Sequence, residues 1–456
     1  MTRKFIDREE ELSQLEDSWQ RGDHLIIVYG RRRVGKTELL KRFMTDKPTV
    51  YYLCSLRKVQ YNLRRFSHKV SEFLKIPRIE FSSFQDAFEA LRGRGRVLVV
   101  IDEFGYLVRD DPGILSDFQE IVDEKLRDSE ITLILCGSSV SLMETRVMGA
   151  KSPLYGRADR YLRVRPFKPE HLASWFPNTA PDDLIKIYAV TGGVARYLEF
   201  FSGSDVEAEI ERNFFDPSSF LYMDAMTLLS EELRDYATYL QVLEAISLGY
   251  NRVTEIANYA FLQPKDVHFY LKVLSTLGIV RRIVPVLSPR KTKRGIYEIV
   301  DNYFDFWFAF VSPFQSEIES GYGDPVLRNF REKFPVYLGR VFERTVRDLI
   351  KPLLPFRPMQ VGRWWHRDVE IDVVAHDDSH IAFLEVKWSD LSLKAARKLL
   401  ISLMEKASKL RFDGKRYYGL VAKSITGKEE LSKEGFIVYD LRDILTHRDH
   451  SSGKNT

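Results

Sequence analysis

The sequence predicts an α/β fold for a chain of two to four domains. Apolar runs at Leu25–Tyr29, Val97–Ile101 and Ile131–Cys136 alternate with helix-like segments over about the first 165 residues, as in a parallel sheet covered by helices. At 456 residues the chain is too long for a single hydrophobic core. A hydrophobic content of 44% supports folded domains over disorder.

The segment that follows the first apolar run carries the most specific motif. GRRRVGKT fits the phosphate-binding pattern G-x-x-x-x-G-K-[ST], with the helix-like Glu38–Phe43 after it. Backbone N–H groups of such a loop, with the helix N-terminus, cradle phosphate. We expect Lys36 to reach the terminal phosphates of a nucleoside triphosphate and Thr37 to place its hydroxyl on Mg²⁺. The predicted nucleotide-binding positions in the loop are Gly30, Arg31, Arg32, Arg33, Val34, Gly35, Lys36 and Thr37.

The second apolar run ends in two acidic residues. Asp102 is placed to hold the Mg²⁺ shell, and Glu103 to polarise an attacking water as general base. A purely structural interpretation makes Asp102 the N-cap of the next helix, but it leaves Glu103 unexplained. After the third run, Ser138 either senses the γ-phosphate or, like Ser139, caps the following helix. These residues predict hydrolysis as well as binding.

Charge and cysteine content set the limits for other functions. A net charge of +4 permits nucleic-acid binding without arguing for it. Cys54 and Cys136 lie in or beside apolar segments and are expected to be buried thiols of a reducing compartment. No signal-peptide core and no apolar run of roughly 20 residues occurs, so we expect a soluble cytoplasmic protein without membrane contact.

Residues 1–230 are predicted to form the nucleotide-binding domain, with a helical lid at about 166–230. Within the lid, Arg196 follows Gly192-Gly193 on the first turn of a helix, from where it could reach the γ-phosphate. Arg157 and Arg160 lie upstream, and one of these arginines could act as an arginine finger, in cis or from a neighbouring subunit. The alternative for each is a solvated or ion-paired surface residue.

Taken together, these motifs resemble the archaeal ATPase family, a branch of P-loop proteins close to AAA+ and to the signal-transduction ATPases with numerous domains. The matching segments are FIDREE, GRRRVGKT, VLVVIDEF, GSS, PLYGR and GGVARYL. The resemblance implies ATP as the nucleotide, Arg157 as a finger candidate and Arg196 as a lid arginine. It also implies that the opening segment helps to position the adenine.

Residues 231–310 show a different pattern. Helix-like segments at 237–248, 254–259 and 264–277 precede a short apolar strand at 279–280. Two further apolar strands, 283–286 and 296–300, flank SPRKTKRG. Three helices and a basic β-hairpin predict a winged helix. Its recognition helix would present Lys265, His268 and Lys272. The wing would place four cations on phosphates, namely Arg290, Lys291, Lys293 and Arg294. Protein docking is the alternative use of such a module.

Residues 311–446 contain a second group of chemically suited side chains. Asp372 lies in an alternating strand, a turn follows, and Glu385 and Lys387 share one face of the returning strand. Two carboxylates can bind Mg²⁺, and a lysine can stabilise charge on a scissile phosphate. Glu343 lies in a preceding helical segment, 336–349, as a third carboxylate. The bland alternative is an exposed hairpin with an ordinary carboxylate–lysine pair.

These four residues resemble the active site of the PD-(D/E)XK nuclease superfamily, in the restriction-endonuclease-like C-terminal domain of unknown function that such ATPases often carry. The expected function is therefore ATP hydrolysis coupled to DNA binding and metal-dependent DNA cleavage. The rival is a nucleotide-regulated switch that binds DNA or protein and has an inactive nuclease-like domain. Self-association and a protein partner are both open. The polar tail, 447–456, is expected to be disordered.

Overall fold

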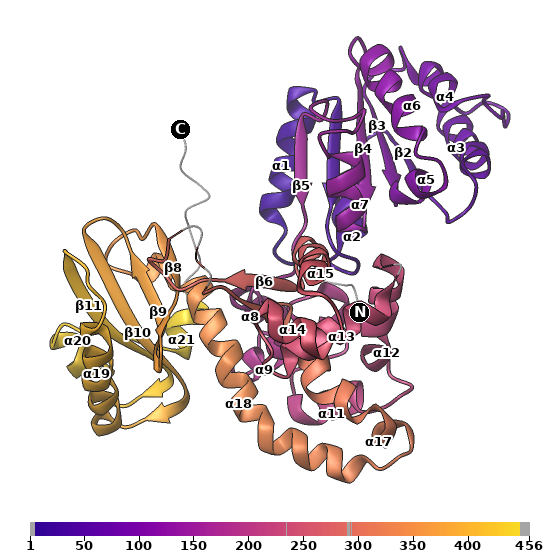
Figure 1. The fold of residues 1–456 in the computed structure, drawn as a ribbon. Helices are drawn as coiled ribbons and strands as arrows, with labels where there is room; N and C mark the ends of the chain where they lie inside the picture. Colours follow the sequence, from indigo (N-terminus) through magenta and orange to yellow (C-terminus); the bar gives the residue numbers. More distant parts are fainter. Residues whose placement is uncertain (1–4, 234, 290–291, 293, 447–456) are drawn as a thin grey trace. The chain divides into compact units, whose positions relative to one another are not determined.

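The computed structural model describes residues 5–233, 235–289, 292 and 294–446 (Figure 1). The chain divides into two compact units. The first comprises the described residues up to Pro166 together with Val194–Arg196, and the second comprises Phe167–Gly193 and the described residues from Tyr197 onward. Most of the predicted lid, 166–230, therefore groups with the second unit. None of the helices in the described ranges is both long enough and apolar enough to cross a membrane.

The first unit is built on a five-stranded parallel sheet in the order β2-β3-β4-β1-β5. Its strands are β1 (Leu25–Tyr29), β2 (Thr49–Leu53), β3 (Val97–Asp102), β4 (Ile131–Gly137) and β5 (Arg160–Arg163). The helices are α1 (Glu9–Arg21), α2 (Lys36–Met44), α3 (Val59–Leu74), α4 (Phe84–Leu91), α5 (Gly105–Asp110), α6 (Ile114–Glu120) and α7 (Val140–Leu142), with α10 (Ala195–Leu198) at the border of the two units. This architecture confirms the α/β prediction.

Both faces of the parallel sheet are buried. Leu25 and Ile27 of β1 pack into the core on the side of α3, α4 and α6, whereas Ile26 and Val28 pack on the side of α1 and α2 (Figure 1). Because alternate strand residues point to opposite faces, a sheet covered on both sides needs apolar residues at every position. This is why the strands were visible in the sequence as continuous apolar runs.

The second unit begins with helices and a small antiparallel sheet. The helices are α8 (Pro169–Trp175), α9 (Pro181–Thr191), α11 (Val206–Phe214), α12 (Phe220–Glu232), α13 (Tyr236–Ser247), α14 (Val253–Tyr259) and α15 (Pro264–Thr276). Strands β6 (Val280–Ile283) and β7 (Ile296–Ile299) pair antiparallel. The predicted strand at 283–286 does not form separately, because β6 ends at Ile283 and Pro285 cannot donate to a ladder.

An aromatic segment connects these helices to the rest of the unit. Helix α16 (Asn302–Phe306) continues as a π-helical turn over Trp307–Val311, and its rings are buried. Helices α17 (Gln315–Glu319) and α18 (Gly323–Leu349) follow. Helix α18 is 27 residues long, about 40 Å at 1.5 Å per residue, and it continues through Pro335. The aromatic side chains of this segment therefore belong to the core.

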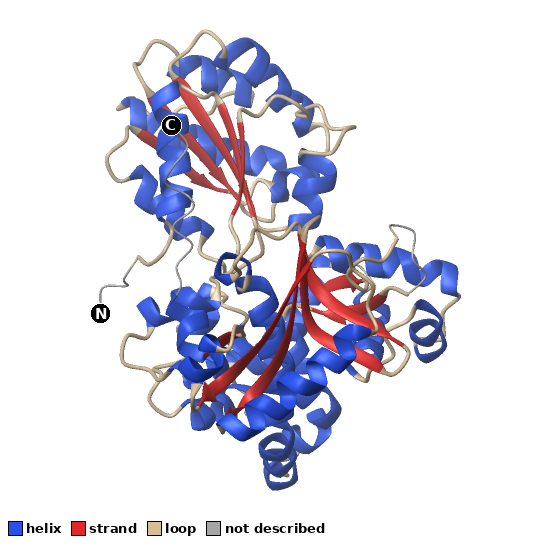
Figure 2. Ribbon diagram, turned by 90° about the vertical axis from the view of Figure 1, so that its left-hand side faces the viewer, coloured by secondary structure: helices blue, strands red, loops and turns tan. Residues whose placement is uncertain are grey.

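The second unit ends in a five-stranded mixed sheet, β12-β11-β10-β9-β8 (strands in red in Figure 2). Its strands are β8 (Gln360–His366), β9 (Val369–His376), β10 (His380–Leu391), β11 (Lys415–Ile425) and β12 (Ile437–Asp440). Strands β8, β9 and β10 are antiparallel, whereas β10, β11 and β12 are parallel. Helices α19 (Leu393–Ser408), α20 (Lys428–Lys433) and α21 (Leu441–Thr446) complete the unit.

The two cysteines are free thiols. Cys54 is 3% exposed and Cys136, in β4, is fully buried. Burial raises the pKa of both thiols well above the ordinary value. They are small core residues, as expected from their apolar surroundings.

Candidate active sites

The phosphate-binding motif forms the turn between β1 and α2, and close contacts fix its backbone. A Cβ atom on Gly30 would lie 2.2 Å from the carbonyl oxygen of Val164, so only glycine fits there. Gly35 has a φ of 96°, in the left-handed region that glycine adopts without strain. Arg33 also has a positive φ, 72°, and its carbonyl accepts a hydrogen bond of 3.1 Å from the backbone N–H of Arg196. The loop is therefore preformed.

Lys36 opens α2 and is 5% exposed. Its Nζ donates hydrogen bonds to the carbonyl oxygens of Gly30 (2.7 Å) and Arg31 (2.9 Å). The ammonium group is thus held within the phosphate loop, where it would also contact the oxygens of a bound phosphate. Along the same loop, Arg32 Nη2 donates to the hydroxyl of Tyr106 at 3.2 Å.

Thr37 and Asp102 meet although 65 positions separate them in the sequence. Thr37 Oγ1 donates a hydrogen bond of 2.9 Å to Oδ2 of Asp102, a carboxylate that is 1% exposed at the end of β3. Tyr51 of β2 donates to the same oxygen at 3.1 Å. Hydroxyl and carboxylate oxygens are the ligands that Mg²⁺ prefers, so this donor set fits the cation. Sequence reasoning missed Tyr51, since a tyrosine in a strand usually indicates packing.

Glu103 and Ser138 lie on neighbouring strand ends. Strand β4 lies between β1 and β3, so its carboxyl end, with Ser138, lies between the phosphate loop and Asp102. Ser138 Oγ donates a hydrogen bond of 2.6 Å to Oε2 of Glu103. Glu103 itself has a φ of 56°, a conformation that non-glycine residues adopt at a cost of about 1 to 3 kcal/mol. Ser138 thus bonds a side chain rather than capping α7.

Arg8 is a further residue of this site that sequence reasoning did not single out. It is 6% exposed, and its Nη2 donates to the carbonyl oxygens of Val34 (2.9 Å) and Arg165 (2.8 Å). An ion pair of 2.7 Å with Glu11 holds the guanidinium in place. Arg8 thereby fixes the phosphate loop from the opening segment FIDREE. The exposed-looking sequence around it, rich in charge, concealed its burial.

The three arginines proposed as finger or lid residues lie in different places. The backbone N–H of Asp159 donates to the carbonyl of Leu25 (2.9 Å), which is the first residue of β1. Arg157 and Arg160, on either side of Asp159 in the sequence, therefore lie at the amino end of that strand. The phosphate loop lies at the other end, four residues or roughly 13 Å away. Arg157 instead forms a two-pronged ion pair with Asp123, with the shortest contact at 2.9 Å. A finger role in a neighbouring subunit stays a prediction.

Arg160 and Arg196 complete this set. Arg160 Nε donates to Ser18 Oγ at 2.5 Å, so it ties β5 to α1. Arg196 is exposed. Its backbone N–H donates to the carbonyl of Arg33, so its side chain begins beside the phosphate loop. A reach to the γ-phosphate agrees with that position and stays a prediction.

The second candidate site lies on the mixed sheet, where β9 and β10 bring Asp372, Glu385 and Lys387 together. Lys387 Nζ lies 2.8 Å from Oε1 of Glu385 and 3.6 Å from Oδ2 of Asp372. The backbone N–H of Val386 donates to the same Asp372 oxygen at 2.8 Å. Asp372 and Glu385 are 8% and 5% exposed. The hairpin thus gathers the residues in the way that the strand periodicity predicted.

A second lysine completes this group. Lys406 of α19 lies 2.9 Å from Oε2 of Glu385, so each oxygen of this carboxylate has an ammonium partner. Burial, followed by the charge of Glu385, raises the pKa of Asp372 above its ordinary value. Burial acts in the opposite sense on Lys387, but the nearby carboxylates outweigh it and raise the pKa of that ammonium. Lys406 was missed because nothing in the sequence of α19 links it to Glu385.

Glu343 approaches this group from helix α18. Burial, followed by the negative charge of Asp372, raises the pKa of Glu343 to about 7. Arg347, one turn later, lies 3.9 Å from Glu343 and donates to the carbonyl of Asp372 at 3.3 Å. Across the described ranges, no group of three His, Cys, Asp or Glu side chains has an arrangement that could hold a metal ion. Asp372 and Glu385 therefore remain the pair to consider as metal ligands, with Glu343 beside them.

The predicted DNA-contacting residues are distributed unevenly. Lys265, His268 and Lys272 lie exposed on α15, together with Phe269, which is 62% exposed. Arg294 is exposed just before β7. The other predicted wing cations, Arg290, Lys291 and Lys293, lie outside the described residues, as does the tail, 447–456.

Comparison with known proteins identifies an ATPase domain over the residues that form the first site. Residues 5–201 match the model of an ATPase domain predominantly from Archaea, and residues 307–399 match a family of archaeal and bacterial proteins of unknown function. An uncharacterised protein of Methanocaldococcus jannaschii is 34% identical over 452 residues, which span 96% of this chain and all of that protein. An uncharacterised ATP-binding protein of the same organism is 54% identical over 44 residues, 9% of this chain and 75% of that protein.

Among solved structures, the Walker-type ATPase of Pyrococcus abyssi has a similar fold, with a TM-score of 0.53 and 23% identity over 67% of this chain and 96% of that chain. The Methanocaldococcus jannaschii protein that matches 96% of this chain extends over both segments that the two family models match. The chain belongs to the family of ATPases found predominantly in Archaea, and it joins that ATPase domain to a C-terminal segment from a family of unknown function.

Proposed function

We propose that this ATPase couples ATP hydrolysis to the binding of DNA and to its metal-dependent cleavage in the C-terminal domain. Nucleotide binding and hydrolysis follow from the ATPase domain itself. The observation that carries the cleavage half is the contact of Asp372, Glu385 and Lys387 on adjacent strands of the mixed sheet.

The residues around the phosphate loop support specific roles in hydrolysis. When bound, ATP with Mg²⁺ supplies the phosphoanhydride bond to be cleaved and a cation that offsets its charge. Thr37 and Asp102 would hold the cation, and Lys36 would leave the loop carbonyls to share the terminal phosphates. Glu103 would accept the proton of the attacking water. Its bond from Ser138 fixes the carboxylate in one orientation before the nucleotide arrives.

The order of elements around the second site supports a nuclease role. A helix with Glu343, three antiparallel strands, helix α19 and parallel strand β11 follow one another. Asp372 and Glu385 offer the hard oxygen ligands that Mg²⁺ prefers, and Lys387 offers a cation for the scissile phosphate. The cation, when bound, would lower the pKa of a coordinated water.

The elements α13, α14, α15, β6 and β7 support DNA contact as a winged helix. The exposed face of α15 carries Lys265, His268 and Lys272, and Arg294 adds a cation near β7. Cations on an exposed helix and hairpin are suited to phosphate contact, which makes binding dependent on salt. Protein docking stays the alternative for this surface, because Phe269 is also exposed on it.

Coupling between the two sites would run along the backbone of residues 189–196. Arg196 bonds the phosphate loop at Arg33, and seven residues earlier in the chain the carbonyl of Ala189 accepts a bond of 2.7 Å from Tyr337. Tyr337 and Glu343 lie on the same helix, about 9 Å apart along its axis. A change in the loop that moved residues 189–196 would therefore reach the carboxylate group through α18.

The decisive experiment is cleavage of supercoiled and single-stranded DNA with Mg²⁺ or Mn²⁺, with and without ATP. Wild type is compared with Asp372→Ala and with Asp378→Ala, an exposed carboxylate of the same hairpin turn that serves as the matched control. Cleavage lost only in Asp372→Ala is the expected result. Separately, Lys36→Ala should abolish nucleotide binding or hydrolysis, and normal turnover in that variant would contradict the roles proposed at the phosphate loop.

The ion pairs of Glu385 favour a second candidate function, which the same experiment tests. Both carboxylate oxygens of Glu385 are paired with lysines, Lys387 and Lys406, an arrangement that is electrostatically complete without a cation. This favours a nucleotide-regulated switch that binds DNA or protein through an inactive nuclease-like domain. Salt-sensitive DNA binding with no cleavage by wild type under any of the conditions above would support the switch.

A further inference from the structure

A cavity of about 510 Å³ lies in the second unit, beside the carboxylate–lysine group. Its walls come from the end of α13, the start of α14, strand β7, helix α18 and the hairpin of β8 and β9. This volume is in the range of small-molecule sites, about 300 to 1,000 Å³. Of the second candidate site, Glu343 and Arg347 line this cavity, whereas Asp372, Glu385 and Lys387 are not among its lining residues.

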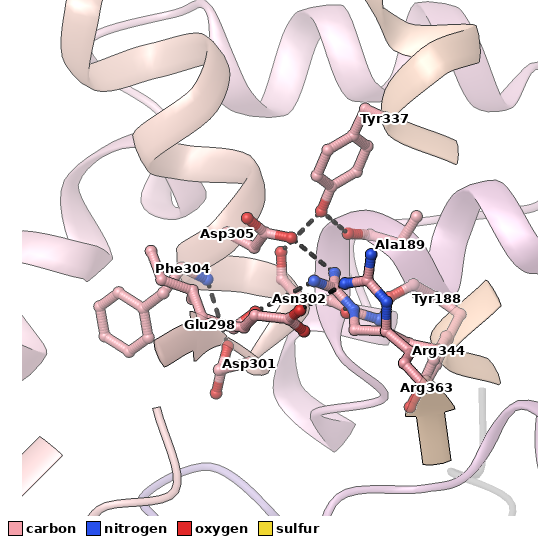
Figure 3. Close-up of polar contacts among 11 residues, drawn as sticks. Tyr188, Ala189, Glu298, Asp301, Asn302, Phe304, Asp305, Tyr337, Arg344 and Arg363 are labelled. Carbon is pink, nitrogen blue, oxygen red and sulfur yellow. Dashed lines mark hydrogen bonds and ion pairs between the residues drawn. The ribbon is translucent and has the colours of Figure 1, made fainter. Parts of the chain in front are cut away.

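Six arginines line the cavity, namely Arg252, Arg340, Arg344, Arg347, Arg363 and Arg367. Three of them, Arg344, Arg347 and Arg363, have 9% to 22% of the side chain exposed and are together termed the floor. Arg344 donates to Asn302 (3.1 Å) and pairs with Asp305 (2.5 Å), as Figure 3 shows. Arg363 pairs with Glu298 at 2.6 Å and also contacts Glu370. The floor is thus held in position by its own carboxylates.

The floor nevertheless keeps unused donor capacity. The Nε–H groups of Arg344 and Arg363 are buried, and neither has a hydrogen-bond partner among the described residues. A buried donor without a partner is destabilising, so a ligand acceptor at either group would be stabilising. Burial, followed by the positive charge of Arg363, lowers the pKa of Arg347 to about 10, so Arg347 stays charged at neutral pH.

The other three arginines, Arg252, Arg340 and Arg367, are exposed and are termed the rim. Asp368, next to Arg367 in the chain, is the lining carboxylate outside the ion pairs of the floor. Within the described part of the chain, no carboxylate lies within ion-pair distance of Arg252, Arg340 or Arg367. Trp365 and Tyr297 also line the cavity and contribute aromatic rings to its wall. Guanidinium groups bind phosphate in two-pronged fashion, and aromatic rings stack on bases.

We propose that this cavity binds the phosphate and base of a nucleotide, either as a free nucleotide or as a nucleotide within a single strand of nucleic acid. The rim arginines take the phosphate, and Trp365 or Tyr297 stacks on the base. The cavity is continuous with the carboxylate group, because Glu343 lines it and Arg347 bonds the carbonyl of Asp372. Binding stands independently of catalysis, whereas a role in presenting a strand for cleavage rests on the proposed function.

The test measures affinity for two probes in the full chain, in a Lys36→Ala background that weakens the phosphate loop. The probes are thymidine 5′-monophosphate and a fluorescent 12-nucleotide single-stranded DNA, by calorimetry and anisotropy respectively. The double variant Arg340→Ala/Arg367→Ala is compared with Arg328→Ala, an exposed arginine of the same helix outside the cavity. A charge-assisted contact contributes about 1.5 kcal/mol or more, which corresponds to about tenfold in affinity for each arginine.

We expect the double variant to weaken binding of at least one probe about 100-fold while Arg328→Ala stays within threefold of its parent. Weakening for the mononucleotide identifies a free nucleotide, and weakening for the oligonucleotide alone identifies a strand. Equal affinity of the double variant and the control for both probes would overturn the proposal, provided circular dichroism and Tm match those of the parent. Asp372→Ala, tested beside them, separates binding from cleavage: it should keep both affinities even where cleavage is lost.

Discussion

The hydroxyl of Ser138 donates a 2.6 Å hydrogen bond to Oε2 of Glu103, and this bond joins the ends of two adjacent parallel strands. Glu103 has left-handed backbone geometry, so its carboxylate is set by a strained residue and a fixed donor together. The hydrogen bond and the backbone geometry together restrict the orientation of this carboxylate.

Replacing Glu103 by Gln should lower the rate of ATP hydrolysis about 10²- to 10⁴-fold, the usual contribution of a general base, while nucleotide affinity stays near that of wild type. Ser138→Ala should give a smaller loss in rate, because it frees the carboxylate without removing it. Phosphate release and equilibrium nucleotide binding measure the two effects. Glu124→Gln, at an exposed position, is the control, and wild-type hydrolysis by Glu103→Gln would contradict the assignment.

Arg8→Ala should weaken nucleotide binding about tenfold, because the loop loses the buried guanidinium that fixes the carbonyl of Val34. The same change should lower the Tm, since two backbone carbonyls lose a charged donor. Nucleotide titration and thermal unfolding test this. Arg21→Ala removes an exposed arginine at the end of α1, the helix that follows Arg8, and should change neither quantity.

Lys406→Met should raise the affinity for Mn²⁺ at the second site about tenfold. The ammonium of Lys406 competes with a cation for Oε2 of Glu385, and its removal leaves that oxygen without a charged partner. Calorimetric titration with Mn²⁺ gives the affinity, and Lys409→Met, at an exposed position on the same helix end, is the control. Unchanged or weaker binding in Lys406→Met would show that the lysine does not occupy the cation position.

The stability of the metal-free protein should fall as pH rises from about 4.5 to about 7. Glu343 has its pKa raised to about 7 from an ordinary 4.5, so the folded state binds the extra proton in that window. The stabilisation is complete below 4.5 and lost as pH rises through 7, by at most about 3 kcal/mol. The charged groups that face Glu343 are Asp372, Arg363, Arg347 and Lys387.

Glu343→Gln isolates this titration. Thermal unfolding in the presence of EDTA at pH 5.5 and pH 8 should show a larger drop in Tm for wild type than for Glu343→Gln. Equal drops in the two proteins would mean that Glu343 titrates at its ordinary pKa.

Tyr337→Phe should reduce any effect of ATP on the C-terminal domain without changing ATP hydrolysis by itself. The variant loses only the hydroxyl that bonds the carbonyls of Ala189 (2.7 Å) and Asn302 (3.1 Å) and keeps the buried ring. The ratio of DNA affinity with and without ATP is the quantity to compare, with Tyr322→Phe, an exposed tyrosine, as the control. An unchanged ratio would place the coupling elsewhere.

Short stretches of sequence were sufficient to predict the parts of the fold that depend on short-range spacing. The phosphate loop, its flanking strand and helix, and the pairing of Glu385 with Lys387 follow from short-range spacing, so they were predictable. Helix α18 begins 13 residues earlier than predicted. In the sequence, Pro335 indicates a helix boundary. In the structure, burial of Phe330 and Phe334 keeps the residues before it helical. Tertiary packing overrode the local signal there.

The missed residues share one property. Arg8, Tyr51 and Lys406 act on partners that lie 21 or more positions away, and each occupies a segment whose own pattern indicates a helix surface or a packed strand. Their roles depend on topology, such as the adjacency of β2 and β3, which periodicity does not specify. Arg157 is the converse case, since its motif was visible but its place at the amino ends of the strands was not.

The burial of both native thiols makes this chain suited to single-site labelling. Maleimide reagents react with exposed thiolates, and neither Cys54 nor Cys136 offers one at neutral pH, since both are buried with raised pKa values. A cysteine introduced at an exposed position, such as Asp378, would then carry the only reactive sulfur in the folded protein. A fluorophore at that position could thus report changes in its surroundings during turnover without any removal of native cysteines.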